Sequence, residues 1–185
     1  MKHILMLLSI TLTIGVNAQT KAVYKPYNSI VELKGTSYVI ATKNNWNKFS
    51  APDEKSLLFI NTLNGDTNRV QLSASGYYTE FRQIKLDSLD INLVIATDRT
   101  VDLNNKSGIN WDDPEQLFAI STDGKVKTQL TENGFFVNTW TVNSQTGYLV
   151  VSGYLELNNN NKFDNTERNE LLIFDLKTLK LLRRI

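Results

Sequence analysis

The chain has 185 residues, with 20 basic and 19 acidic side chains, one histidine and no cysteine. A nearly neutral chain lacks the basic surface on which binding to nucleic acid or to an anionic membrane depends, so its charge argues against both partners. The single histidine is His3, so residues 19–185 hold neither an imidazole nor a thiol. Catalysis by His or Cys is therefore excluded, and so is metal binding through His or Cys ligands.

The first eighteen residues have the pattern of an export signal. A basic residue, Lys2, precedes a short apolar run over 4–14 and a small-residue cleavage site before Gln19. The apolar run is too short to cross a membrane, and no later segment approaches that length, so no membrane span is expected. We therefore predict a signal peptide over 1–18, a single β-repeat domain over 19–185, and a secreted or periplasmic location.

The chain then shows a repeat. The segments 38–42, 93–97 and 149–153 read YVIAT, LVIAT and LVVSG, and the valines at 39, 94 and 150 are 55 and 56 positions apart. A fixed period of this length indicates similar units that bury their apolar faces against one another.

Strand signals dominate from residue 29 to the end, and no segment has a sustained helical period. Asn64-Gly65, Asp123-Gly124 and Asn133-Gly134 are typical of tight turns. In chain order the predicted strands are 29–33, 37–42, 57–60, 69–73, 77–86, 91–101, 117–120, 125–131, 135–142, 148–157, 171–175 and 179–184.

These strands group into units of four. Residues 57–101 and 117–157 each form one antiparallel meander, which leaves two strands at each end of the chain as halves of a further unit. The expected fold class is all-β, with repeated four-stranded antiparallel meanders in a propeller-like arrangement of about three blades, one of them completed by the terminal half-blades. A β-sandwich or barrel is the alternative.

One segment carries a family resemblance. Residues 117–131, LFAISTDGKVKTQLT, resemble the TolB-type, WD40-like β-propeller repeat, in which a strand, a D-G turn and a QLT strand open each blade, and residues 171–178 are similar. The usual SPDG signature is replaced by VNSQTG at 142–147. The resemblance covers most of 19–185 and implies a binding scaffold without carrying catalytic residues onto this chain. Single-chain propellers usually need at least four blades to close. Two resolutions are open: a homodimer that forms a six-bladed ring, or a sandwich or barrel in which the repeat reflects duplication alone.

A polar loop near the C-terminus has the ligand spacing of an EF-hand-type calcium loop. With Glu156 as position one, oxygen ligands fall at positions three, five, seven, nine and twelve. The seventh would act through its backbone carbonyl, and three carboxylates predict weak Ca²⁺ binding. The alternative is an Asn-rich loop that hydrogen-bonds its own backbone. The predicted ligands are Glu156, Asn158, Asn160, Lys162, Asp164 and Glu167.

An aromatic residue followed four positions later by an acid recurs in the related loops, and this pair is predicted to anchor each loop. The pairs are Phe49 with Asp53, Trp111 with Glu115, and Phe163 with Glu167. Asp112 and Asp113 are interpreted as solvated turn residues before Pro114, with a pair of metal ligands as the alternative.

The predicted function is a non-enzymatic binding or scaffold module that presents loops to a protein or glycan partner. The alternative is a carboxylate-dependent hydrolase that pairs Asp112 or Asp113 with Glu156 or Glu167 as acid and base. A structural envelope protein is a third hypothesis. Aromatic residues such as Trp140 are assigned to the core rather than to sugar stacking.

Overall fold

The computed structural model describes residues 27, 29–42, 56–72, 80–103, 108–110, 112–158, 160, 164 and 166–185. The predicted signal peptide, 1–18, lies outside these residues. Within them the chain forms twelve strands and one short 3-10 helix, η1 (Asp87–Leu89). No helix in the described ranges is long and apolar enough to cross a membrane.

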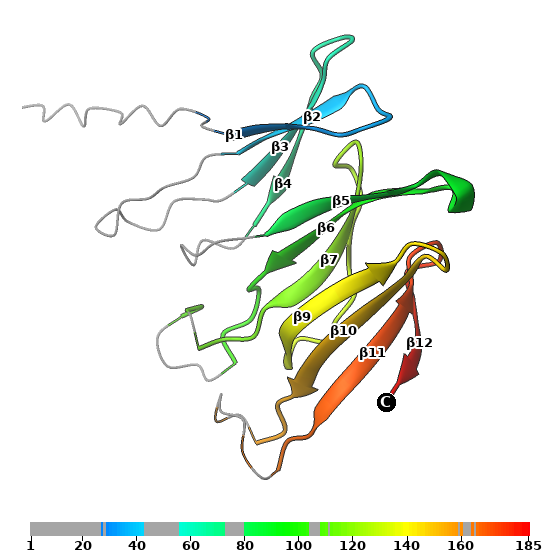
Figure 1. The fold of residues 1–185 in the computed structure, drawn as a ribbon. Coiled ribbons are helices and arrows are strands. Elements are labelled where there is room, and N and C mark those ends of the chain that lie inside the picture. The colour runs from blue at the N-terminus through cyan, green and yellow to red at the C-terminus, as the bar shows by residue number, and fades with distance from the viewer. Residues whose placement is uncertain are drawn as a thin grey trace, which may run out of the picture.

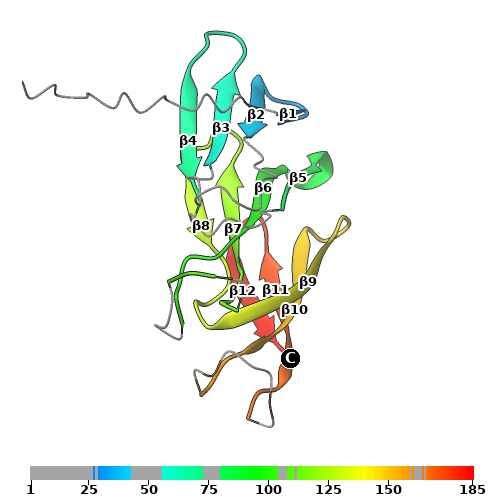
Figure 2. The same ribbon diagram turned by 90° about the vertical axis from the view of Figure 1, so that its left-hand side faces the viewer.

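The strands form three four-stranded antiparallel sheets, each built from consecutive strands. Sheet 1 contains β1 (Ser29–Glu32), β2 (Tyr38–Thr42), β3 (Ser56–Asn61) and β4 (Thr67–Gln71). Sheet 2 contains β5 (Phe81–Leu86), β6 (Ile91–Asp98), β7 (Gln116–Ser121) and β8 (Lys127–Gln129). Sheet 3 contains β9 (Phe135–Asn143), β10 (Tyr148–Leu155), β11 (Asn169–Asp175) and β12 (Lys180–Arg184). The three sheets stack face to face in chain order (Figures 1 and 2). The predicted all-β class with four-stranded meanders is confirmed.

The predicted boundaries of the units are wrong by two strands. The first two strands pair with β3 and β4, and the last two with β9 and β10, so the terminal strands belong to complete sheets and are not half-blades. The reason is that a period fixes the length of a repeat but not the point at which each copy starts. The described strands close no barrel. The six-bladed homodimer rested on split terminal blades, and the oligomeric state stays a prediction.

The three similar segments are the second strands of their sheets, β2, β6 and β10. Val94 is fully buried against sheet 1, and Leu149 is fully buried against sheet 2. Leu149, rather than Val150, therefore takes the place of Val94, because a shift of one residue moves a side chain to the other face of a sheet. The structural period is thus 55 residues at both steps.

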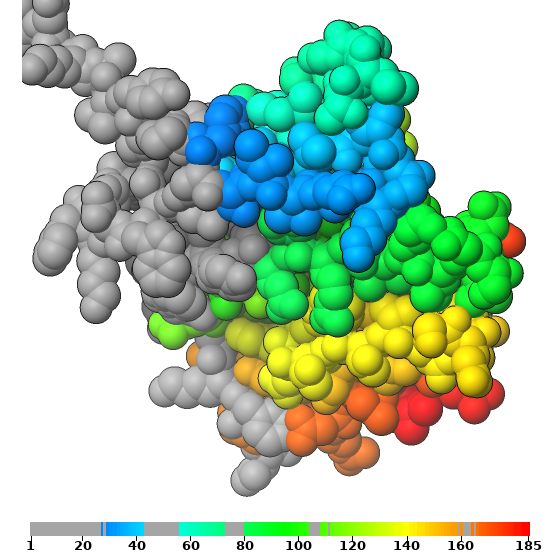
Figure 3. All heavy atoms as spheres, turned by 45° about the horizontal axis from the view of Figure 1, so that its top comes forward, coloured from blue at the N-terminus to red at the C-terminus, as the bar shows by residue number. Residues whose placement is uncertain are grey.

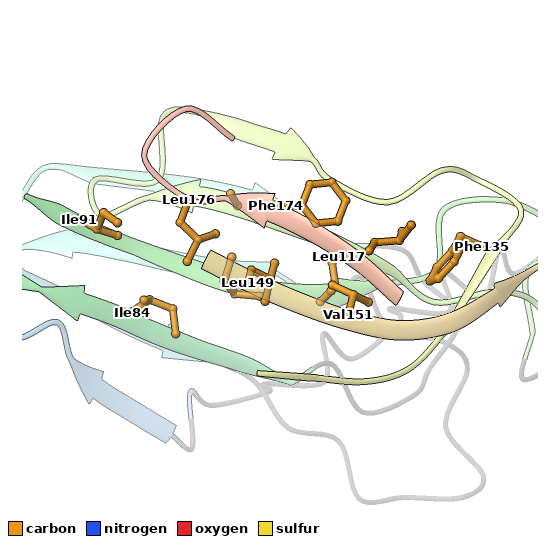
Figure 4. Packing of buried hydrophobic residues seen from close by; sticks show 11 residues of the cluster. Ile84, Ile91, Leu117, Phe135, Leu149, Val151, Phe174 and Leu176 are labelled. Carbon is orange, nitrogen blue, oxygen red and sulfur yellow. The ribbon is translucent and has the colours of Figure 1, made fainter. Parts of the chain in front are cut away.

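Two apolar clusters hold the sheets together. The first joins sheets 1 and 2 through Leu33, Ile40, Leu57, Phe59, Val70, Leu72, Val94, Ala96, Phe118 and Ile120. The second joins sheets 2 and 3 through Ile84, Ile91, Ile95, Leu117, Ala119, Phe135, Leu149, Val151, Leu172, Phe174 and Leu176 (Figure 4). In the space-filling view the sheets appear as successive bands, from blue and cyan through green to yellow and orange (Figure 3). The core is therefore a series of contacts between neighbouring sheets.

The two ends of the strands differ. Short turns, several of them with a glycine at positive φ, connect the strands at one end, which we call the turn end. The connections between the second and third strand of each sheet are long and leave from the opposite end, which we call the long-loop end (Figure 1). The three connections are residues 43–55, 99–115 and 156–168. The first of them, 43–55, lies outside the described residues. Loops on a rigid scaffold are the usual carriers of function, so a functional site is expected at the long-loop end.

Candidate functional site

The 156–168 loop joins β10 to β11 and contains the predicted calcium ligands. Glu156 directly follows β10 and is 7% exposed. Its Oε1 accepts hydrogen bonds from the backbone N–H groups of Asn158 and Asn160, at 3.1 and 3.2 Å. Its Oε2 is buried and has no hydrogen-bond partner among the described residues. This carboxylate therefore fixes the start of the loop and keeps one oxygen unpaired.

Glu167 holds the other side of the loop and is 4% exposed. Its Oε2 accepts the backbone N–H of Asp164 at 2.9 Å, while Oε1 accepts the Thr166 hydroxyl at 2.7 Å and a longer contact from the backbone N–H of Leu157 at 3.4 Å. The carboxylate thus bridges two parts of the loop, an arrangement that we call a clasp.

Asp164 collects the polar side chains on the exposed side of the loop. Its Oδ2 accepts the side-chain amides of Asn158 and Asn160, at 3.0 and 2.7 Å. Its Oδ1 accepts the backbone N–H of Thr166 at 2.8 Å and lies 2.8 Å from the Thr166 hydroxyl, whose single proton it shares with Oε1 of Glu167. The pKa of Asp164 lies well below its usual range because these hydrogen bonds, those from Thr166 first, favour the charged form.

The structure brings together five of the six predicted ligands; Lys162 lies outside the described residues. The self-bonded alternative is also present, since Asn158 Oδ1 accepts the backbone N–H of Asn160 at 3.0 Å. Among the described residues, no three acidic side chains are grouped closely enough to hold a metal by themselves. The carboxylates nonetheless act on their surroundings: burial, followed by the charges of Glu156 and Glu167, raises the pKa of Tyr154.

The 99–115 loop of sheet 2 contains the same clasp. Asp113 is 2% exposed, and its two oxygens accept the backbone N–H groups of Leu103 at 3.0 Å and Asn110 at 2.8 Å. These donors precede Asp113 by ten and three positions. Leu157 and Asp164 precede Glu167 by the same two intervals. The prediction that Asp113 is a solvated turn residue is wrong, whereas Asp112 is exposed as expected.

This equivalence also corrects the alignment of the loops. The sequence pattern paired Glu115 with Glu167, but the residue that matches Glu167 is Asp113. Trp111, Phe49, Asp53 and Phe163, the other members of that pattern, lie outside the described residues. The misalignment arises because the aromatic residues are not at equivalent positions: Trp111 precedes Asp113 by two residues, whereas Phe163 precedes Glu167 by four.

A buried glutamine, which sequence reasoning missed, ties the base of the 99–115 loop to the scaffold. Gln116 is completely buried, and its amide donates to the backbone oxygens of Pro114 at 3.0 Å and Asn133 at 2.9 Å. Its Oε1 accepts the backbone N–H and the hydroxyl of Thr100, both at 3.0 Å. All its polar atoms are thus paired, as burial requires. The sequence feature that could have identified this glutamine is its place as a polar residue at the start of an otherwise apolar strand.

A polar cleft of about 220 Å³ lies between sheets 2 and 3, towards the long-loop end. Arg82 stacks on the Trp140 ring, with its guanidinium carbon 4.1 Å from the ring centroid. Arg99 pairs with Glu115 at 3.1 Å and donates to the backbone oxygen of Asp113 at 3.0 Å. The lining residues are Glu80, Arg82, Thr97, Glu115, Val137, Asn138, Thr139 and Trp140.

Glu115 is the most perturbed acid of the cleft. Burial raises its pKa above the usual value, while the Arg99 charge and the Thr97 hydroxyl act in the opposite direction, and Asp98 and Glu80 add smaller increases. Trp140 packs against the core between sheets 2 and 3, which agrees with its assignment to the core.

The acid pairs predicted for a hydrolase are held in separate loops. Both oxygens of Asp113 accept backbone N–H groups of its own loop, and the contacts of Glu156 and Glu167 lie within the 156–168 loop. Asp112 is exposed. The carboxylates that do share a cleft are Glu80 and Glu115, which the sequence did not single out as a pair.

No family model and no curated protein matches the chain. A solved structure to which it is similar is acylaminoacyl peptidase from Pyrococcus horikoshii, with 10% sequence identity and a TM-score of 0.41, covering 86% of this chain and 24% of that one. The chain therefore spans about a quarter of that protein's length. At this TM-score the likeness establishes neither a shared fold nor a shared activity.

Proposed function

We propose that this chain is an exported, non-enzymatic binding module that presents its long-loop end to a partner outside the cytoplasm. The observation that carries the proposal is the polar cleft between sheets 2 and 3, bordered by a loop that is itself fixed by buried hydrogen bonds. Clasped loops lose little freedom when a ligand binds, so the scaffold is preorganised for recognition. Export rests on the signal pattern over 1–18.

Of the two predicted partner classes, protein and glycan, the cleft favours a glycan. Its lining alternates acceptors, the carboxylates of Glu80 and Glu115, with donors such as the Arg82 guanidinium. Asn138 and Thr139 add groups that both donate and accept. Sugar hydroxyl groups likewise donate and accept, and about 220 Å³ suits one or two sugar rings better than an apolar side chain.

The test is a glycan-array screen of residues 19–185, followed by calorimetric titration of the best ligand. Asn138→Ala and Thr139→Val alter exposed side chains of the cleft, and we expect each to weaken binding about tenfold, as loss of one or two hydrogen bonds does. Ser144→Ala, at the exposed turn end, is the matched control and should bind like the wild type. Binding that survives both cleft variants, or binding to proteins but to no glycan, would refute the glycan proposal.

A carboxylate-dependent hydrolase is the second candidate, because Glu80 and Glu115 share the cleft and burial raises the pKa of Glu115, which is the direction that a general acid requires. The ion pair with Arg99 favours the binding role instead, since it engages the carboxylate of Glu115 structurally. Incubation with the bound glycan separates the two roles. Cleavage that is lost in Glu115→Gln would establish the enzyme; an intact glycan after prolonged incubation supports the binding module.

Export is tested separately. Fusion of residues 1–18 to a reporter that is active only after translocation should give signal, and a fusion that begins at residue 19 should not. Equal signal from both fusions would remove the secreted or periplasmic assignment.

Light scattering of residues 19–185 measures the oligomeric state, and a strict monomer would remove the predicted homodimer.

A further inference from the structure

We propose that the 156–167 loop is a Ca²⁺ site in which Glu156 and Asp164 are the charged ligands and Glu167 is a positioning residue. This site lies apart from the polar cleft and does not depend on the proposed glycan binding. Three observations carry it: an unpaired buried oxygen, a convergent set of amide groups, and a sister loop that has the clasp but holds Lys106 and Asn110 at the positions of Asn160 and Asp164.

The unpaired oxygen is Oε2 of Glu156. The side chain is 93% buried, since 7% is exposed, and its other oxygen is fixed by the backbone N–H groups of Asn158 and Asn160. A buried carboxylate oxygen without a partner is costly, and it calls for a hydrogen-bond donor or a cation. The described residues supply no donor, so the chemistry of this atom is that of an anionic ligand at the base of the loop.

The convergent amides belong to Asn158 and Asn160, whose Nδ2 atoms lie 3.0 and 2.7 Å from Asp164 Oδ2. The oxygen and nitrogen of an Asn amide exchange places by rotation of the group. Rotation of the Asn160 amide turns its oxygen toward the position at which it now donates to Asp164. A cation between Glu156 and Asp164 would therefore meet carboxylate and amide oxygens, the ligands that Ca²⁺ takes in proteins.

The sister loop contains the same clasp, and Asp102, at the position of Glu156, likewise has a buried carboxylate oxygen without a hydrogen-bond partner among the described residues. Asp113 accepts the backbone N–H groups of the residues ten and three positions before it, and Glu167 accepts the N–H groups at the same two intervals. The two oxygens of Glu167 likewise accept hydrogen bonds from its own loop, so its role is to fix the loop on which the ligands lie. In the sister segment, Lys106 stands at the position of Asn160, a cationic residue where the proposed site has an oxygen ligand.

The affinity follows from the ligands. Two charged ligands with neutral oxygens resemble the weaker extracellular Ca²⁺ modules, for which dissociation constants are on the order of 10⁻⁴–10⁻³ M. Mg²⁺ requires a small octahedral shell and keeps its water, so a loop of amide and carboxylate oxygens should bind it more weakly than Ca²⁺.

The experiment uses residues 19–185, titrated with CaCl₂ by calorimetry and with TbCl₃ by luminescence. We expect one Ca²⁺ per chain in that affinity range, Tb³⁺ emission sensitised through nearby Tyr154, and a melting temperature that rises with Ca²⁺ concentration. Asp164→Asn, at an exposed position, should weaken Ca²⁺ binding at least tenfold. Glu156→Gln should do the same.

Asp112→Asn, an exposed acid of the sister loop, is the matched control and should bind as the wild type does. Glu156→Gln replaces a buried group, so its circular dichroism spectrum is compared with the wild type before titration, and Asp164→Asn decides the case if Glu156→Gln does not fold. The proposal is overturned if 10 mM Ca²⁺ (about ten times the weakest expected constant) gives neither heat nor a melting shift. It is overturned equally if Asp164→Asn binds Ca²⁺ like the control.

Discussion

The ring of Phe59 lies where a side chain on Gly124 would have to go. A Cβ atom built on Gly124 would be 2.5 Å from Cδ2 of Phe59, a ring that is completely buried between sheets 1 and 2. Next to it, the Asn68 amide donates to the backbone oxygen of Asp123 at 2.8 Å. The β7–β8 turn of sheet 2 is thus fitted onto sheet 1 by shape and by a hydrogen bond.

Gly124→Ala should therefore cost stability in two ways. The residue has φ +72°, which costs an L residue about 1–2 kcal/mol, and crowding of Phe59 adds about 1–3 kcal/mol. Gly65→Ala is the control, because Gly65 has φ +79° and nothing within 4 Å of its built Cβ. Urea unfolding should show a larger loss for Gly124→Ala. Equal losses would mean that the contact with Phe59 contributes nothing.

The clasp of the 99–115 loop gives a second prediction. Asp113→Asn leaves one acceptor where two backbone N–H groups point, and turns an NH₂ group toward one of them. Loss of a charged hydrogen bond at a buried site should lower the free energy of unfolding by about 2–4 kcal/mol. The adjacent Asp112→Asn, on an exposed side chain, should stay within about 0.5 kcal/mol of the wild type. A mild effect at Asp113, comparable to that at Asp112, would argue against the clasp.

Glu115 predicts an unusual dependence of stability on pH. Its pKa is raised in the folded state, chiefly by burial, so the folded protein keeps this proton at pH values where the unfolded chain has released it. The contribution of Glu115 to stability is therefore present below its usual pKa of 4.5 and is lost as pH rises through the raised value. Relative to the wild type, Glu115→Gln should gain stability as pH rises through this window.

Asp123→Asn provides a control of opposite sign. The Ser121 hydroxyl is the main cause that lowers the pKa of Asp123, so its contribution is present above the usual 3.8 and disappears as pH falls through the lowered value. The two variants, measured by chemical unfolding across pH, should diverge from the wild type in different windows. A flat difference for Glu115→Gln would show that burial does not govern its titration.

Much of the fold was predictable because alternation and turn residues act locally. Asn64-Gly65 and Asp123-Gly124 correctly marked turns, and all twelve strands were expected near their positions. The grouping into sheets was not predictable from the repeat, since every starting point along a periodic chain gives the same spacing. The slip between Val150 and Leu149 has a similar origin: both are apolar, and only burial against sheet 2 distinguishes them.

Less of the site was predictable. The EF-hand spacing named Asn158, Asn160 and Asp164 as members of one set, and both amides contact Asp164 because the loop turns back and brings residues six and four positions apart together. The cleft could not be predicted from the sequence. Glu80 precedes β5, Glu115 precedes β7 and Trp140 lies in β9, and these positions meet only when sheets 2 and 3 stack. Asp113 and Gln116 look like ordinary polar residues until their burial is known.

The serial arrangement of the cores has a consequence for how the molecule comes apart. Sheet 2 is packed on both faces, whereas each apolar cluster reaches sheet 1 or sheet 3 from one side alone. In such linear arrays the outer units open first, without disturbing the rest. Amide protons of β6 and β7 should therefore exchange with deuterium last, and the molecule should loosen from its two ends inward.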